Sequence, residues 1–333
     1  MNASVPAIPH PKAQRIPTGE NLFKTLLLIA LLMASFFAAD QAAKAIDAST
    51  ALPGAAATAA KWSLVTLLAI VNGVLLVGLA VLAHDAVHKV LFPSAFWNEL
   101  AGGVLSALVL VPFYANRQYH ITHHGCAHQP GLDPEEGMHR HRFWYAATLG
   151  SLHGFDAHFR IVVGNLRRIA EPRCAARGLA DIAFMASAGA IYFWLVPALG
   201  ISISVSVLPA IPGFLAAFAF RGLSDHYGVP AVRRAGDAAW DTDRSKRQRD
   251  VSGWVVRTTP WLEWLWSHVN YHEVHHKFPY LSHRHLPAAF EATRRTHSYL
   301  VVRGYWRSLL NQRKRAYYAS PEEVRAFLHS EGA

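Results

Sequence analysis

The chain has 333 residues, of which 52% are apolar and only 16% are charged, against about a quarter in soluble proteins. This composition excludes an ordinary soluble enzyme and a disordered chain. The formal net charge of +10 comes from residues that flank the apolar runs, which indicates a membrane protein with no nucleic-acid partner.

Three apolar stretches predict four membrane spans. Thr25–Ala39 is uncharged, and Lys24 can snorkel to extend it toward the about 20 residues that a span needs. The alternative, a cleaved secretory signal, is disfavoured because its positive leader would be unusually long. Trp62–Ala83 is uncharged throughout, and Ile182–Phe220 is long enough for a helical hairpin with a break near Pro197–Gly200.

The segment Leu100–Asn116 is ambiguous because it is apolar but short, and it contains Gly102, Gly103 and Pro112. Whether this segment crosses the bilayer decides on which side the following residues lie.

Basic residues are concentrated in two regions, 140–177 and 233–257, which the positive-inside rule assigns to the cytoplasm. The loop after the first span has only Lys44 and Lys61, partly offset by Asp40 and Asp47, so it should face outward. If Leu100–Asn116 does not cross, both termini also fall on the cytoplasmic side.

We therefore expect an all-α fold of about four transmembrane helices, one re-entrant or interfacial segment and a histidine-rich cytoplasmic helical cap. Residues 1–20 are expected to form a cytoplasmic tail. Residues 21–333 are expected to form a single membrane domain, within which 293–333 is a basic C-terminal extension.

Histidine is unusually frequent, with 20 copies, whereas the chain has only two cysteines. Eight histidines form three clusters: His84 and His88; His120, His123 and His124; and His272, His275 and His276. Residues three and four apart lie on one face of a helix, so each cluster can present several imidazoles to one point, as a metal site requires.

Chance does not explain these clusters. Two H-x-x-H-H patterns are expected by chance in well under about 1 in 100 chains of this histidine content. Isolated histidines such as His128 and His283 are instead expected to have ordinary structural roles. The spacing alone suits zinc, copper, nickel or iron.

The clusters resemble the three histidine boxes of the integral-membrane fatty acid desaturase and hydroxylase superfamily, which read H-x-x-x-H, H-x-x-H-H and H-x-x-H-H. The segment Asn270–Pro279, which reads NYHEVHHKFP, resembles the longer pattern around the third box, and Asp133-Pro134-Glu135 resembles the D-P-[DE] that often follows the second. The segment Arg221–His226 resembles an R-x-x-x-[ED]-H element that usually adds a further ligand.

The resemblance implies a site for two iron ions on the cytoplasmic side, with dioxygen as co-substrate. The implied metal ligands are His84, His88, His120, His123, His124, His226, His272, His275 and His276. Asp85, Asp225 and Asn270 are expected to lie around these ligands or to act through water. A common site also requires that Leu100–Asn116 does not cross the membrane.

The implied reaction is desaturation of a fatty acyl chain in a lipid. A carotenoid ketolase or hydroxylase, or a lipid or alkyl hydroxylase, is the alternative within the superfamily. The sequence has no Rossmann glycine pattern and no thiolate cluster, so a ferredoxin-type or cytochrome-type electron donor must be external. A divalent-metal transporter is a remote alternative, because the spans contain almost no ionisable side chains.

Overall fold

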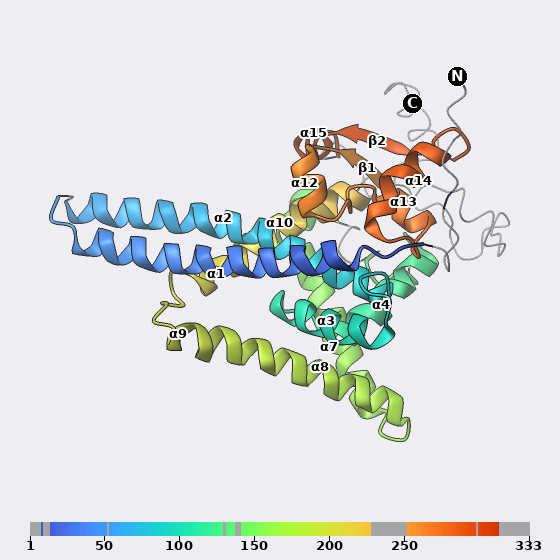
Figure 1. Ribbon diagram of the computed structural model, residues 1–333, viewed down its shortest axis with the longest axis horizontal. Coiled ribbons are helices and arrows are strands. Elements are labelled where there is room, and N and C mark those ends of the chain that lie inside the picture. The colour runs from blue at the N-terminus through green and yellow to red at the C-terminus, as the bar shows by residue number, and fades with distance from the viewer. Residues whose placement is uncertain are drawn as a thin grey trace.

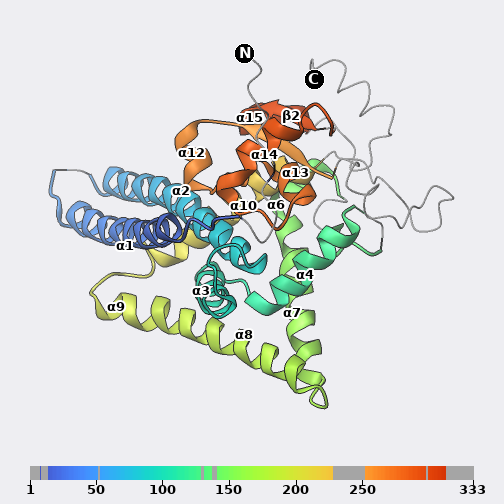
Figure 2. The same cartoon turned by 45° about the vertical axis from the view of Figure 1, so that its right-hand side comes forward.

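The computed structural model describes residues 8, 14–51, 53–128, 131–136, 141–227, 252–297 and 299–312. In these residues the fold is mostly helical, with long apolar helices extending from a cap of short helices and two short strands (Figures 1 and 2). Much of the expected N-terminal tail, 1–20, and of the C-terminal extension, 293–333, lies outside the described residues.

The four predicted spans are confirmed. Helices long and apolar enough to cross a membrane are α1 (Thr18–Ala48), α2 (Gly54–Val87), the segment Pro172–Ala198 and α10 (Val207–His226). The third of these consists of α8 (Pro172–Ala190), a π-helical turn η1 (Ile191–Leu195) and α9 (Val196–Ala198). Helices suit this role because they satisfy their backbone hydrogen bonds internally.

Helix α2 is the centre of the bundle. In its most apolar window 56% of the residues are buried, against 22–28% in the other three spans, whose side chains face outward where lipid would cover them. At about 1.5 Å per residue, its 34 residues extend about 51 Å, well beyond the about 30 Å of a bilayer core. Its last turn, with His84, therefore reaches the cap.

Helix α10 crosses α2 at a contact between glycines. A Cβ atom on Gly213 would lie 2.0 Å from the carbonyl oxygen of Ala69, and one on Gly73 would lie 2.2 Å from the carbonyl oxygen of Gly213. The two backbones can approach this closely only because both side chains are absent. This crossing sets the position of the C-terminal end of α10 relative to that of α2.

Helices α3 (Ala95–Leu108) and α4 (Phe113–Cys126) are bent by 98° relative to each other. Leu110 has a positive φ of 60° at the bend, and the Asp181 carboxylate of α8 accepts the backbone N–H groups of Tyr114 and Ala115 in the first turn of α4. Because α4 returns His120 to within 2.9 Å of His84, the segment between them does not cross to the other side, as the sequence analysis expected.

In the described residues the cap contains short helices and a small sheet. Its helices are α6 (Phe143–Thr148), α12 (Pro260–Leu265), α13 (His272–Lys277), α14 (Leu286–Thr293) and α15 (Tyr305–Gln312), with a 3-10 turn η2 (His283–His285). The longer helix α7 (Gly150–Arg167) packs against α4 and α8 instead. Strands β1 (Trp254–Arg257) and β2 (Leu300–Arg303) pair in parallel, with Trp254 opposite Leu300. Strand β2 and helix α15, which belong to the expected C-terminal extension, are thus packed into the cap.

Polar contacts hold the cap on the spans, and two of them lie at the turn after α12. The Trp266 indole donates a hydrogen bond to the Val74 carbonyl of α2, and the Lys24 ammonium of α1 donates one to the Ser267 hydroxyl at 3.2 Å. The expectation that Lys24 snorkels outward is therefore wrong: its side chain is fully buried, because the turn after α12 covers this end of α1.

The glycine crossing generates a test. Gly213→Ala should lower the free energy of unfolding by about 1–3 kcal/mol, because the new methyl group meets backbone that cannot move aside as a side chain can. Gly189→Ala on α8, where a Cβ atom meets nothing within 4 Å, is the matched control and should be neutral. Thermal unfolding in detergent measures both; an unchanged melting temperature for Gly213→Ala would contradict the close crossing.

Candidate metal centre

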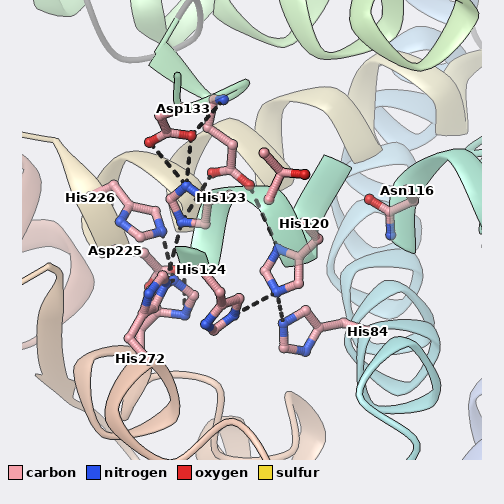
Figure 3. Close-up of polar contacts among 12 residues, drawn as sticks. His84, Asn116, His120, His123, His124, Asp133, Asp225, His226 and His272 are labelled. Carbon is pink, nitrogen blue, oxygen red and sulfur yellow. Dashed lines mark hydrogen bonds and ion pairs between the residues drawn. The ribbon is translucent and has the colours of Figure 1, made fainter. Parts of the chain in front are cut away.

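The nine predicted histidines converge at one place from four elements. His84 lies in the last turn of α2 and His88 directly follows this helix, the second box lies on α4, His226 is the last residue of α10, and the third box lies on α13. Figure 3 shows imidazoles from these separate elements pointing toward one another. The sequence analysis therefore identified the residues that the fold brings together, although they span positions 84–276.

Five of them form a first cluster, called here the five-histidine group. Its ring nitrogens lie within 4.8 Å of one another, and Nε2···Nε2 distances of 2.9 Å join His120 to both His84 and His124. Donor atoms bound to one metal at about 2.1 Å lie at most about 4.2 Å apart, so separations near 3 Å suit a shared ion. The members are His84, His88, His120, His124 and His275.

The other four form a second cluster, called here the four-histidine group. His123, His226 and His276 have ring nitrogens within 4.8 Å of one another. His272 joins them, because its Nε2 lies 2.7 Å from Nε2 of His226 and 3.1 Å from Nε2 of His276. The two groups touch where the rings of His124 and His276 stack with centroids 4.1 Å apart.

The two H-x-x-H-H boxes contribute their i, i+4 histidine pairs to different groups. In the second box the i, i+4 pair, His120 and His124, enters the five-histidine group, and His123 enters the other. In the third box the i, i+4 pair, His272 and His276, lies in the four-histidine group, and His275 enters the five-histidine group. Adjacent helical residues point about 100° apart, so each H-H dipeptide supplies one imidazole to each group.

Burial keeps most of these imidazoles neutral, the form that binds metal. It lowers the pKa of His120 to about 3 and holds the pKa values of His88, His124 and His275 well below their usual range. His123 is the exception. Burial alone would lower its pKa, but the Asp133 and Glu135 carboxylates outweigh this effect and raise it to about 9.

Several ligand candidates are oriented from behind, through the ring nitrogen that faces away from the group. Nδ1 of His123 donates to Asp133 at 2.9 Å, and Nδ1 of His226 donates to the Ser252 carbonyl at 3.0 Å. Such contacts fix the ring orientation and leave Nε2 free for a metal. The structure thus presents inward-facing imidazole nitrogens, a donor set that fits iron or zinc.

Two of the three polar residues expected around the ligands lie behind ligand histidines. Asp85 is 3.8 Å from Nδ1 of His84, and Asp225 is 3.8 Å from Nδ1 of His272. The side-chain amide nitrogen of Asn270 donates to the Val256 carbonyl and to Glu263, whereas its Oδ1 is buried without a hydrogen-bond partner among the described residues. Its visible role is to fix the turn that precedes α13.

His128, His283 and Ser252 had no individual signal in the sequence. His128 and His283, both expected to be ordinary, are buried; His128 contacts the Ser252 carbonyl, and His283 contacts Asp85 at 2.8 Å. Ser252 donates its N–H and hydroxyl to Glu273, so it is held in place from the third box. Only the D-P-E spacing after the second box indicated Asp133 and Glu135.

A cavity of about 130 Å³ opens onto both groups. Its lining includes His84 and His120 of the five-histidine group and His226 and His272 of the four-histidine group. The remaining lining is largely apolar and includes Ala80, Val109, Val111, Phe214, Leu215 and Phe218. A mainly apolar space beside convergent polar groups is the usual form of a site for an apolar substrate.

Comparison with known proteins agrees with this geometry. The profile of the fatty acid desaturase family matches residues 60–306, which include every histidine of both groups. The chain belongs to the fatty acid desaturase family. It is therefore an oxidoreductase of the desaturase superfamily, a multi-pass membrane protein that acts on lipid. No curated protein sequence matches the chain.

The contact between Asp133 and His123 generates a prediction. Asp133→Asn should weaken metal binding by the four-histidine group roughly 10–100-fold, because the neutral amide is a poorer acceptor for Nδ1 of His123. Asp156→Asn, which removes a carboxylate from an exposed ion pair with Arg160, is the control. Metal titration of metal-free protein measures the change; equal affinities for the two variants would contradict the orienting role.

Proposed function

We propose that the chain is a membrane-bound di-iron desaturase that introduces a double bond into the alkyl chain of a lipid. The observation that carries the proposal is the pair of histidine groups side by side, both open to one largely apolar cavity. Removal of two hydrogens from the substrate, with two electrons and two protons from outside, reduces dioxygen to two waters.

Bound at the two groups, iron would supply the activation of dioxygen, which no side chain can provide. The chain's own residues would do the rest. His84 and His226 reach the cavity from α2 and α10, so a substrate carbon in the cavity lies beside both groups. The apolar walls formed by Val109 and Phe214 exclude water and position a chain that has no polar handle.

We place the site and both termini on the cytoplasmic side. Arg167 ends α7, Arg168 follows it and Arg173 lies in the first turn of α8, at the end of the third span that points away from the α1–α2 turn (Figure 1). The opposite end of the bundle, between α1 and α2, has Lys61 neutralised by Asp47 at 2.6 Å. This asymmetry supports the assignment of the cap to the cytoplasm.

An external donor of ferredoxin or cytochrome type would supply the electrons. Both groups consist of imidazoles, and the two cysteines, Cys126 and Cys174, are far apart in the sequence and free. The two cysteines thus cannot hold an iron–sulfur cluster that needs four thiolates.

The proposal is tested by expressing the chain beside His275→Ala, which removes one member of the five-histidine group, and His153→Ala, which removes a half-buried histidine outside both groups. We expect a new unsaturated acyl species with the unaltered chain and with His153→Ala, and background levels with His275→Ala. Fatty-acid and pigment profiles of the cells measure this outcome.

The same profiles distinguish the alternatives. An oxygenated product that carries label from ¹⁸O₂, with unchanged acyl unsaturation, would replace the desaturase by a hydroxylase or a carotenoid ketolase. Full activity of His275→Ala would instead overturn the assignment of the reaction to this centre.

A further inference from the structure

A smaller cavity of about 40 Å³ lies among the spans, next to the cavity at the histidine groups. Its lining is apolar except for Tyr192, whose hydroxyl donates to the Leu108 carbonyl at 2.6 Å. Val109 and Phe214 line both cavities. We infer that the substrate chain continues past Phe214 into the smaller cavity and that its far end emerges beside Phe193 among the alkyl chains of the bilayer. This inference rests on the proposed function, since it concerns the substrate of that site.

The two cavities follow the same side of α10. Positions three or four apart on a helix lie on one face. The lining positions of α10 repeat at this spacing from the smaller cavity to the histidine groups: Val207, Ile211, Phe214, Phe218, Gly222 and His226. Helix α2 likewise adds Leu76 to the smaller cavity and Ala80 and His84 to the other. The cavities therefore form one path along α2 and α10, with Val109 and Phe214 at the junction.

The smaller cavity lies deeper in the membrane than the histidine groups. At about 1.5 Å per residue, the 20 residues of α10 extend about 30 Å, the thickness of a bilayer core. His226 is at the end of α10 that reaches the metal centre, and Ile211 lies about 22 Å along the helix from it. Ile211 is therefore inside the hydrocarbon core, where the smaller cavity is surrounded by lipid chains.

Phe193 marks the place where the smaller cavity opens to the outside of the bundle. It is 56% exposed, whereas Phe36, Tyr192 and Phe214, which also line this cavity, are at most 6% exposed. Phe193 belongs to the third span, so the surface that it exposes faces lipid. The path from the histidine groups thus ends at the bilayer and not at a closed wall.

The third span departs from a regular α-helix at this opening. Tyr192 and Phe193 lie in the π-helical turn η1, and such turns are frequent at functional sites. The hydrogen bond to Leu108 holds Tyr192 inward, and its ring meets that of Phe36 edge-on with centroids 6.5 Å apart. Phe193, the next residue, is left at the outer surface, where its side chain borders the opening.

An open path determines which substrates fit. Lipid chains are as apolar as the side chains that line the smaller cavity, so a chain end that emerges among them meets no unfavourable surroundings. A substrate placed in this way keeps the orientation of the surrounding lipids, with its polar end at the membrane surface and its far end in the core. The substrate class is therefore a long-chain lipid of the membrane, and the site does not limit the length of the chain beyond the oxidised carbon.

The test locates the chain end directly. The probe is a palmitic acid analogue with a photoreactive diazirine beside its terminal methyl group, in phosphatidylcholine vesicles that contain the iron-loaded protein. After illumination, mass spectrometry identifies the labelled residues. We expect label on Tyr192, which is 6% exposed and which the surrounding lipid does not reach. Leu208, which is 46% exposed, reports labelling by probe in the surrounding lipid.

A variant that fills the smaller cavity should remove this label. Ala210 lines that cavity and is 3% exposed, so Ala210→Phe should lower the label on Tyr192 at least tenfold and leave that on Leu208 unchanged. Ala216→Phe adds the same ring at an exposed position of α10 and is the matched control. If melting temperatures show that Ala210→Phe does not fold, Ile211→Trp at the half-buried edge of the cavity replaces it.

The products give a second readout. Cells fed fatty acids of increasing length should yield oxidised products throughout the series with the unaltered chain and with Ala216→Phe. With Ala210→Phe the longer substrates should be converted at least tenfold less than the shorter ones. A sharp upper limit of chain length with the unaltered chain would contradict the open path.

The inference is also overturned if Tyr192 carries no label in the unaltered chain, or if Ala210→Phe and Ala216→Phe label Tyr192 equally. These results leave the proposed function intact, because they concern the path of the chain and not the reaction. If Tyr192 is labelled as expected but cells form no oxidised product, the proposed function fails while the path of the chain stands.

Discussion

The structure depends on bringing nine imidazoles together in a buried space. Ring nitrogens at 2.7–3.3 Å, removed from water, are favourable only when they are neutral and when something occupies the space that they face. Burial provides the first condition by lowering the pKa of most of these histidines, and a metal ion would provide the second. The helices around the site keep these histidines in position.

Three features of the fold bring the histidines to the same place. The length of α2 carries His84 past the bilayer core, and the glycine contact between α2 and α10 fixes where His226 arrives. The sharp bend between α3 and α4 returns the second box to the same end of the molecule. The cap then closes the site with the third box, whose Glu273 holds Ser252 behind His226.

The sequence predicted the spans and the eight clustered histidines, because long apolar runs and closely spaced imidazoles are local patterns. The expectations for His226 and for the segment that does not cross came from the family resemblance. The sequence did not predict that Lys24 is buried or that two strands pair in parallel, since both depend on contacts between distant segments. The contacts of Glu135 with His120 and His123 likewise follow from tertiary structure. The two H-x-x-H-H boxes also look alike in sequence, although the i, i+4 pair of α4 enters the five-histidine group and that of α13 lies in the four-histidine group.

The most direct measurement is anomalous X-ray diffraction at the iron edge from crystals of the iron-loaded protein. We expect two iron peaks, one among His84, His88, His120, His124 and His275, and the other among His123, His226, His272 and His276. A single peak, or iron located away from these histidines, would contradict the two-site centre on which the proposed function depends.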